Sequence, residues 1–359
     1  MIPDRPEAGR GSFYDRPTKA RTPLPGSARR PSRTLSLAVL GAVLLAGVGA
    51  ACSSEGATSS ATNDPDALAV HVASFDLAAG PPSRFVAGVL DADQRLVGFG
   101  TVEMQFSFLG TLRAEGAPVP VGAPATARFL VIPGTEPPDP APVEPEVITG
   151  GERGVYASQV TFDRPGLWEV EVTASIDGEP RRGTGAFSVA DRHRIAAVGD
   201  VVAATDNLTM ASTQVPKAAI DSRAGSDGEV PDPGLHATTI AAAVAAKRPA
   251  VVVFATPVYC TSRFCGPVTD LVGELATAYA ARAEFIHVEI WEDFQNNVLN
   301  QAARDWLYRD DDLSEPWVFV IDADGRVIAR FDNVVTRAEL EPIITALPVA
   351  PDGGGGGGG

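Results

Sequence analysis

Strand-like segments alternate with helical segments over the last third of the chain, and this order restricts the possible fold more than any other feature. The strand-like segments are 249–257, 283–291, 316–322 and 326–333. The helical segments, with apolar residues on one face, are 267–282, 296–308 and 337–347. We expect the first two strands to be parallel, because a helix connects them, and the last two to be antiparallel, because a tight turn connects them.

Residues 66–190 show a period-two alternation of apolar and polar residues, which is typical of strands with one buried face. The alternating segments are 67–77, 84–92, 102–110, 125–134, 154–163, 167–176 and 183–191. Seven short strands without a convincing helix predict an immunoglobulin-like sandwich. His71 is alone in its strand, and we expect it at the surface or at a sheet edge. No residue here points to catalysis, so we expect a spacer or a docking module, or else a unit that only packs against its neighbour.

The N-terminal residues resemble a bacterial lipoprotein signal. An Arg-rich stretch over 1–34 precedes the uncharged segment 35–51, whose small final residues lie directly before Cys52. In that family the cysteine becomes the lipidated first residue of the mature protein. We therefore expect lipidation at Cys52 and an extracytoplasmic protein that is anchored to the cell membrane. An uncleaved anchor helix is the alternative.

The acidic character of the chain excludes one class of partner. Its 29 Lys and Arg residues against 45 Asp and Glu residues give a net charge of −16, so we expect no binding to nucleic acid. The chain divides into a signal segment, a Ser/Thr-rich tether, a β-sandwich, an extended linker, a C-terminal α/β domain and a Gly-rich tail. Their bounds are 1–51, 52–65, 66–190, 191–234, 235–349 and 350–359.

Two cysteines remain if Cys52 carries lipid, and their surroundings resemble the thioredoxin superfamily. The matching residues are VVVFATPVYC, which ends at Cys260, then Cys265, and SEPWVFVIDADG, in which Pro316 opens the third strand. The resemblance implies thiol–disulfide oxidoreductase activity through Cys260 and Cys265, with Pro316 beside them after a cis peptide bond. The expected fold class is multidomain: an N-terminal all-β immunoglobulin-like sandwich and a C-terminal α/β thioredoxin-like fold.

Four residues separate Cys260 from Cys265, where that superfamily has two. Positions i and i+5 diverge too far on a helix for a disulfide, so we expect Cys260 in the loop and Cys265 at or just before the helix start. Free N–H groups there stabilise a thiolate, and Arg263 would add to this. We expect Cys260 to be the attacking thiol and Cys265 the resolving one. In the alternative alignment with the superfamily motif, Cys265 is the attacking thiol. The buried acid that the superfamily carries on its first strand is missing from 250–254.

Other functions are compatible with parts of the sequence. The disulfide could be structural, in a non-catalytic binding module of the cell envelope. A Sco-type copper-handling protein is less favoured, because His287 lies on the second strand and three Met supply few soft ligands. Residues 256–261 resemble a peroxiredoxin motif only faintly. We predict no metal site and no cofactor, exported protein thiols or disulfides as partners, and no special role for His236, His287 or Glu289.

Overall fold

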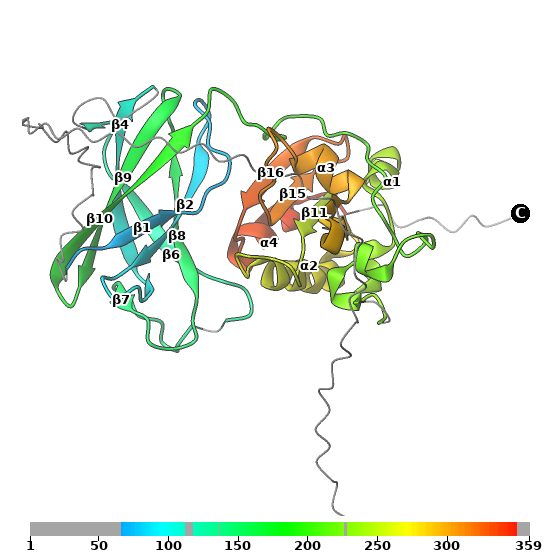
Figure 1. The fold of residues 1–359 in the computed structure, drawn as a ribbon, viewed down its shortest axis with the longest axis horizontal. Helices are drawn as coiled ribbons and strands as arrows, with labels where there is room; N and C mark the ends of the chain where they lie inside the picture. Colours follow the sequence, from blue (N-terminus) through cyan, green and yellow to red (C-terminus); the bar gives the residue numbers. More distant parts are fainter. Residues whose placement is uncertain (1–65, 112–117, 136, 226–227, 350–359) are drawn as a thin grey trace, which may run out of the picture. The chain divides into compact units, whose positions relative to one another are not determined.

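The structure is a computed structural model that describes residues 66–111, 118–135, 137–225 and 228–349 (Figure 1). These residues all belong to the compact unit Ala61–Gly359. The predicted signal segment, Cys52, the tether and the Gly-rich tail lie outside the described residues. Within the part of the chain that the structure describes, no helix combines the length and the apolar character that crossing a membrane requires.

Eight strands in the first half of the described chain form one antiparallel sheet. They are β1 (Ala69–Val72), β2 (Ser83–Leu90), β4 (Thr101–Gly110), β5 (Val119–Pro120), β6 (Ala125–Val131), β8 (Gly154–Val160), β9 (Gly166–Ile176) and β10 (Glu179–Val189). The order across the sheet is β1-β2-β8-β6-β4-β9-β10, and β5 pairs with β4. Two further strands, β3 (Val97–Gly98) and β7 (Glu146–Val147), pair with each other. Each of the seven segments that were predicted as strands overlaps one of these strands.

This sheet buries one side of its strands and nearly closes on itself. In β9 every second residue is buried, from Trp168 through Val170 and Val172. At the ends of the strand order, the Leu68 N–H donates to the Arg182 carbonyl at 2.8 Å. Gly183 permits this approach, because a Cβ atom at this position would overlap with the Leu68 carbonyl.

The predicted immunoglobulin-like sandwich is therefore wrong. A sandwich consists of two sheets that face each other, whereas these eight strands share one continuous set of pairings in which β1 approaches β10. Alternation identifies which segments are strands, but it does not specify which strands pair. The expected surface position of His71, which is exposed on β1, is confirmed.

A second sheet of four strands is formed by the C-terminal part of the described chain. Its order is β12 (Glu284–Glu289), β11 (Ala250–Ala255), β15 (Trp317–Ile321) and β16 (Val327–Asp332). As expected, β11 and β12 are parallel and β15 and β16 are antiparallel. A small pair, β13 (Trp291–Asp293) and β14 (Val298–Leu299), follows β12.

Short helices cover both faces of this second sheet (Figure 1). On one face, α1 (Ile240–Ala245) and α3 (Gln301–Leu307) pack around Phe254 and Phe319. On the other, α2 (Cys265–Tyr279) and α4 (Arg337–Ala346) pack around Val253 and Val320. Four 3-10 helices complete this region: η1 (Lys217–Ala219), η2 (Ser222–Ala224), η3 (Pro233–His236) and η4 (Phe294–Asn296).

The fold class expected for the C-terminal region is also wrong. The chain is predominantly β, with 37% strand and 19% helix, and the described ranges contain only four α-helices. Two of these, α1 and α3, have six and seven residues, and no thioredoxin-like α/β fold is evident. Segment order and a cysteine pair at a strand end describe local structure, and they do not by themselves identify a fold family.

Candidate functional site

The two cysteines lie where β11 ends and α2 begins. Cys260 and Cys265 form a disulfide, with their Cα atoms 6.1 Å apart. Cys260 lies in the loop and is half-buried, whereas Cys265 is the first residue of α2 and is fully buried. The expected placement of the two residues is confirmed. A reactant that arrives from solvent therefore meets the sulfur of Cys260 first.

Short polar contacts order the loop between the cysteines. The Cys260 Sγ lies 3.2 Å from the Ser262 Oγ, and the Phe264 N–H donates to the same hydroxyl oxygen at 3.4 Å. Arg263, which we expected near a thiolate, is exposed and has a left-handed backbone with φ of 64°.

A carboxyl group contacts the buried sulfur. The Glu315 Oε2 lies 3.0 Å from the Cys265 Sγ and accepts a hydrogen bond from the Thr256 N–H at 3.1 Å. Burial raises the pKa of Glu315 to about 7, and the negative charge of Glu289 adds to this rise. The hydrogen bond from the Thr256 N–H opposes the rise. Near neutral pH both protonation states of Glu315 are populated, as an acid–base catalyst requires. No acid lies at 250–254, and the carboxyl group beside the cysteine comes instead from Glu315, which directly precedes Pro316.

Pro316 follows Glu315 and is buried where β15 begins. The Glu315–Pro316 peptide bond is cis, as expected. The Pro316 carbonyl accepts a hydrogen bond from the Asn333 N–H at 2.9 Å. Glu315, rather than Pro316, makes the polar contact with the disulfide.

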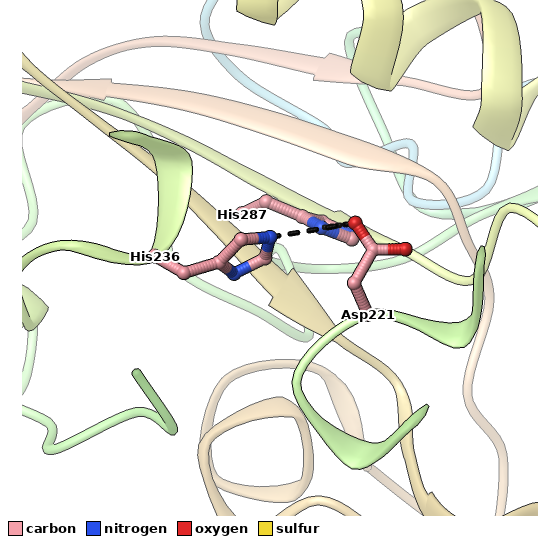
Figure 2. Close-up of side chains that lie close together, drawn as sticks. All are labelled: Asp221, His236 and His287. Carbon is pink, nitrogen blue, oxygen red and sulfur yellow. Dashed lines mark hydrogen bonds and ion pairs between the residues drawn. The ribbon is translucent and has the colours of Figure 1, made fainter. Parts of the chain in front are cut away.

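Asp221, His236 and His287 converge in the interior, next to β12 (Figure 2). Asp221 directly precedes η2, His236 ends η3, and His287 lies within β12. Each of the three is 0% exposed. The Asp221 Oδ2 lies 3.4 Å from the His236 Nε2 and 3.3 Å from the His287 Nδ1. The stretch 191–234, which we expected to be an extended linker, thus contributes a buried side chain to this cluster.

Arg223 contacts both oxygens of the Asp221 carboxylate, including the one that the two rings face. Its Nη2 donates to Oδ2 at 2.8 Å and its Nε to Oδ1 at 3.1 Å. Burial alone would raise the pKa of Asp221, but hydrogen bonds from His236, His287 and Arg223 outweigh burial and hold this pKa far below its ordinary value. Asp221 is therefore an ionised carboxylate that can only accept hydrogen bonds.

Hydrogen-bond partners assign the protons of the two rings. The His287 Nε2 lies 3.1 Å from the Ala255 carbonyl oxygen, and its Nδ1 faces the Asp221 carboxylate. The carbonyl oxygen can only accept a hydrogen bond, so the Nε2 of His287 carries a proton. The His236 Nδ1 has no hydrogen-bond partner among the described residues. Since burial lowers the pKa of His236 although Asp221 opposes this, we assign it as neutral, with its proton on Nε2.

Glu289 is a second buried acid on the same strand. It is 1% exposed and lies two positions after His287 on β12. Its Oε2 accepts the Ser222 N–H at 2.8 Å and its Oε1 accepts the Ile290 N–H at 3.0 Å. Burial raises the pKa of Glu289, and the charge of His287 opposes this rise.

Two groups of side chains have the spacing of metal ligands. The ligand atoms of Asp221, His236 and His287 lie within 4.8 Å of one another, as do those of the disulfide cysteines and Glu315. The first group does not suit a cation, because the Arg223 guanidinium already contacts the oxygen that both rings face. In the second group the two sulfurs are bonded to each other. We therefore interpret the first group as a hydrogen-bonded network and the second as a disulfide with a carboxyl group beside it.

Aromatic side chains lie beside the disulfide loop. The ring of Tyr259 stacks on Phe294 with centroids 4.0 Å apart, and Trp291 meets Phe294 edge-on at 5.4 Å. Phe294 is 37% exposed and Val258 is 55% exposed. The surface next to Cys260 is thus partly apolar.

The sequence carried a signal for some of the residues that we missed. His287 and Glu289 interrupt the otherwise apolar stretch 285–291. Both faces of such a strand are buried, so its polar side chains need hydrogen-bond partners in the interior. Glu315 stands directly before Pro316, at the start of a buried strand. Asp221 carried no signal, because only the tertiary structure brings the stretch before η2 to β12.

Comparison with protein-family models, with curated proteins and with solved structures finds no match to this chain.

Proposed function

We propose that the protein carries out thiol–disulfide exchange through the Cys260–Cys265 disulfide, with Glu315 as the proton donor and acceptor for Cys265. The observation that supports this most directly is the 3.0 Å approach of the Glu315 Oε2 to the Cys265 Sγ. A carboxyl group whose pKa is raised to about 7 is suited to protonate a leaving thiolate near neutral pH.

The burial of the two cysteine residues suggests the order of steps. A thiolate of a substrate dithiol attacks the half-buried Cys260 Sγ, the Cys260–Cys265 bond breaks, and Cys265 leaves as a thiolate that takes the Glu315 proton. The second substrate thiolate then attacks the substrate sulfur of the mixed disulfide and releases Cys260, which takes a proton from solvent. The substrate dithiol is oxidised by two electrons and the protein disulfide is reduced by two. Reduction of a substrate disulfide follows the same steps in reverse.

A purely structural disulfide explains this arrangement less well. Closing a loop of six residues stabilises a fold by only about 2 kcal/mol in the chain-entropy picture. Such a bond also needs no acid at its buried sulfur. The pairing of Cys265 with Glu315 favours a bond that opens and closes.

The partners and the location that we propose come from the sequence. The segment before Cys52 resembles a lipoprotein signal, so the substrates would be thiols or disulfides of exported proteins, and the lipid would hold the protein at the membrane. Disulfide chemistry suits that compartment, because the cytosol keeps thiols reduced.

Trapping of mixed disulfides tests the proposed function. If Cys260 exchanges with substrate and Cys265 leaves, Cys265→Ser should accumulate mixed disulfides with exported proteins, because no second thiol can resolve them. Cys260→Ser is the matched control and should trap few, because Cys265 is fully buried. Adducts are counted on non-reducing gels of the envelope fraction.

Two results would change the proposal. If neither variant traps a partner and the purified protein exchanges with no dithiol, the disulfide is structural and the protein is a binding module. If only Cys260→Ser traps partners, Cys265 is the sulfur that exchanges with substrate.

A further inference from the structure

A groove lies between the disulfide loop and the large sheet, inside the compact unit Ala61–Gly359. Its volume is about 600 Å³. Ser262, Arg263 and Phe264 of the loop line one side, and residues of β1, β2 and β8 line the other. The Ser262 Oγ lies 3.2 Å from the Cys260 Sγ, so the loop side of the groove contacts the sulfur that a reactant from solvent meets first.

Most of the side chains that line this groove are apolar. They include Val72, Phe75, Leu90, Leu96, Ile132 and Phe264. Phe264, the residue before Cys265, packs against a buried cluster that consists of Val86, Ile132, Val155 and Val334. The loop is thus held against the large sheet while the disulfide is closed, and the groove exists before a partner binds.

Two arginines give the groove its charge. Arg153, directly before β8, and Arg263 both line it, whereas no Asp or Glu is among its described lining residues. Both arginines are exposed, and neither guanidinium forms a hydrogen bond or an ion pair with another residue that the structure describes. In a chain with a net charge of −16, the groove is therefore a local positive site.

The acids nearest to this site already have partners. The same two arginines also line a neighbouring hollow, whose lining includes Asp270 and Glu274. Asp270 pairs with Arg223 at 2.9 Å, and Glu274 pairs with Arg337 at 2.6 Å. The two arginines of the groove thus remain available to a carboxylate that a partner supplies.

We propose that the groove binds an extended segment of the substrate protein in which apolar residues and carboxylates are combined, with Arg153 and Arg263 holding the carboxylates. This inference rests on the proposed function and names the kind of polypeptide whose cysteine exchanges with Cys260. A guanidinium group binds a carboxylate through two parallel hydrogen bonds, and the apolar lining buries the neighbouring side chains. An extended chain advances about 3.3 Å per residue, so a cysteine a few residues beyond the bound segment can reach the sulfur.

The chemistry of the groove favours a peptide over an anionic membrane surface. The net charge of −16 repels lipid headgroups of the same sign. A bilayer surface is also too broad to enter a groove between a loop and a sheet, whereas one extended peptide can enter it. The proposed occupant is therefore an acidic and apolar polypeptide segment.

Peptide binding to the oxidised full chain tests the inference without an exchange step. The probe is a fluorescein-labelled peptide without cysteine, in which Leu and Glu alternate, and two matched peptides carry Gln or Lys in place of Glu. Fluorescence anisotropy should show the tightest binding for the Glu peptide, although the net charge of the protein by itself favours the Lys peptide.

Substitution of the arginines connects this binding to the groove. Arg153→Gln and Arg263→Gln should each weaken binding of the Glu peptide by roughly three- to fivefold, as expected for exposed ion pairs. The loss should shrink at high salt, which screens such pairs. Arg192→Gln is the matched control, because Arg192 is also exposed but does not line the groove, and it should leave binding unchanged.

The inference is overturned if the Gln or Lys peptide binds as tightly as the Glu peptide, or if Arg192→Gln weakens binding as much as the groove variants. Binding of anionic phospholipid vesicles through Arg153 and Arg263, with the Glu peptide left unbound, would also overturn it. Trapping by Cys265→Ser decides the proposed function separately. Peptide binding without trapping removes the exchange activity and retains the groove as a binding site, whereas trapping without peptide selectivity removes the groove alone.

Discussion

Glu315 places a carboxyl group within 3.0 Å of the sulfur that must leave when the disulfide opens. We predict that Glu315→Gln slows reduction by a small dithiol by roughly a hundredfold at pH 6, because the leaving thiolate loses its proton donor. Stopped-flow measurement of the released thiols checks this. Glu292→Gln, an exposed acid on β13, is the control and should react at the unaltered rate.

The pH dependence of the same reaction has a definite sign. Only the protonated form of Glu315 can donate, and its pKa is raised to about 7. After correction for the thiolate fraction of the reductant, the rate constant should be level below pH 7 and fall about tenfold per pH unit above it, and Glu315→Gln should remove this step. A profile that is the same in both proteins would exclude Glu315 as the donor.

At the residue scale, the sequence was informative where chemistry and spacing act locally. The spacing of Cys260 and Cys265 excluded a shared helix, and the structure places one in the loop and the other at the helix start. Asp221 and Glu315 could not be identified in this way, because their partners lie 66 and 50 positions away, at His287 and Cys265.

At the scale of elements, local signals specify where helices begin. Thr239 is the residue directly before α1, and its Oγ1 accepts the Ala242 N–H at 3.0 Å. We predict that Thr239→Ala lowers the free energy of unfolding by about 1 kcal/mol, measured by urea denaturation. Thr238→Ala, one position earlier, should change it by less than half as much, and equal losses would contradict the capping role.

Pairing between elements was harder to predict than the elements themselves. Alternation identified the strands of the large sheet, yet two facing sheets were expected where one nearly closed sheet exists. The approach of β1 to β10 depends on Gly183 and on contacts between residues more than a hundred positions apart. Local patterns carry no information about such pairings. The predicted strands were therefore correct, whereas the predicted fold class was wrong.

At the scale of the whole molecule, the prediction concerns attachment. If Cys52 carries lipid, Cys52→Ser should abolish labelling by a fatty-acid analogue and move the protein from the membrane fraction to the soluble fraction. Fractionation with immunoblotting measures this. Ser53→Ala is the control and should leave both unchanged, whereas full membrane retention of Cys52→Ser would support an uncleaved anchor helix.

The aromatic rings next to the loop give the molecule an optical reporter of its own state. Of its four tryptophans, Trp168, Trp306 and Trp317 are buried in the two cores, whereas Trp291 reaches the disulfide loop through Phe294 and Tyr259. If opening of the Cys260–Cys265 bond moves Tyr259, its stack with Phe294 shifts, and the emission of Trp291, which meets Phe294 edge-on, should change with it. The redox state of the protein could then be followed in real time, without a dye and without stopping the reaction.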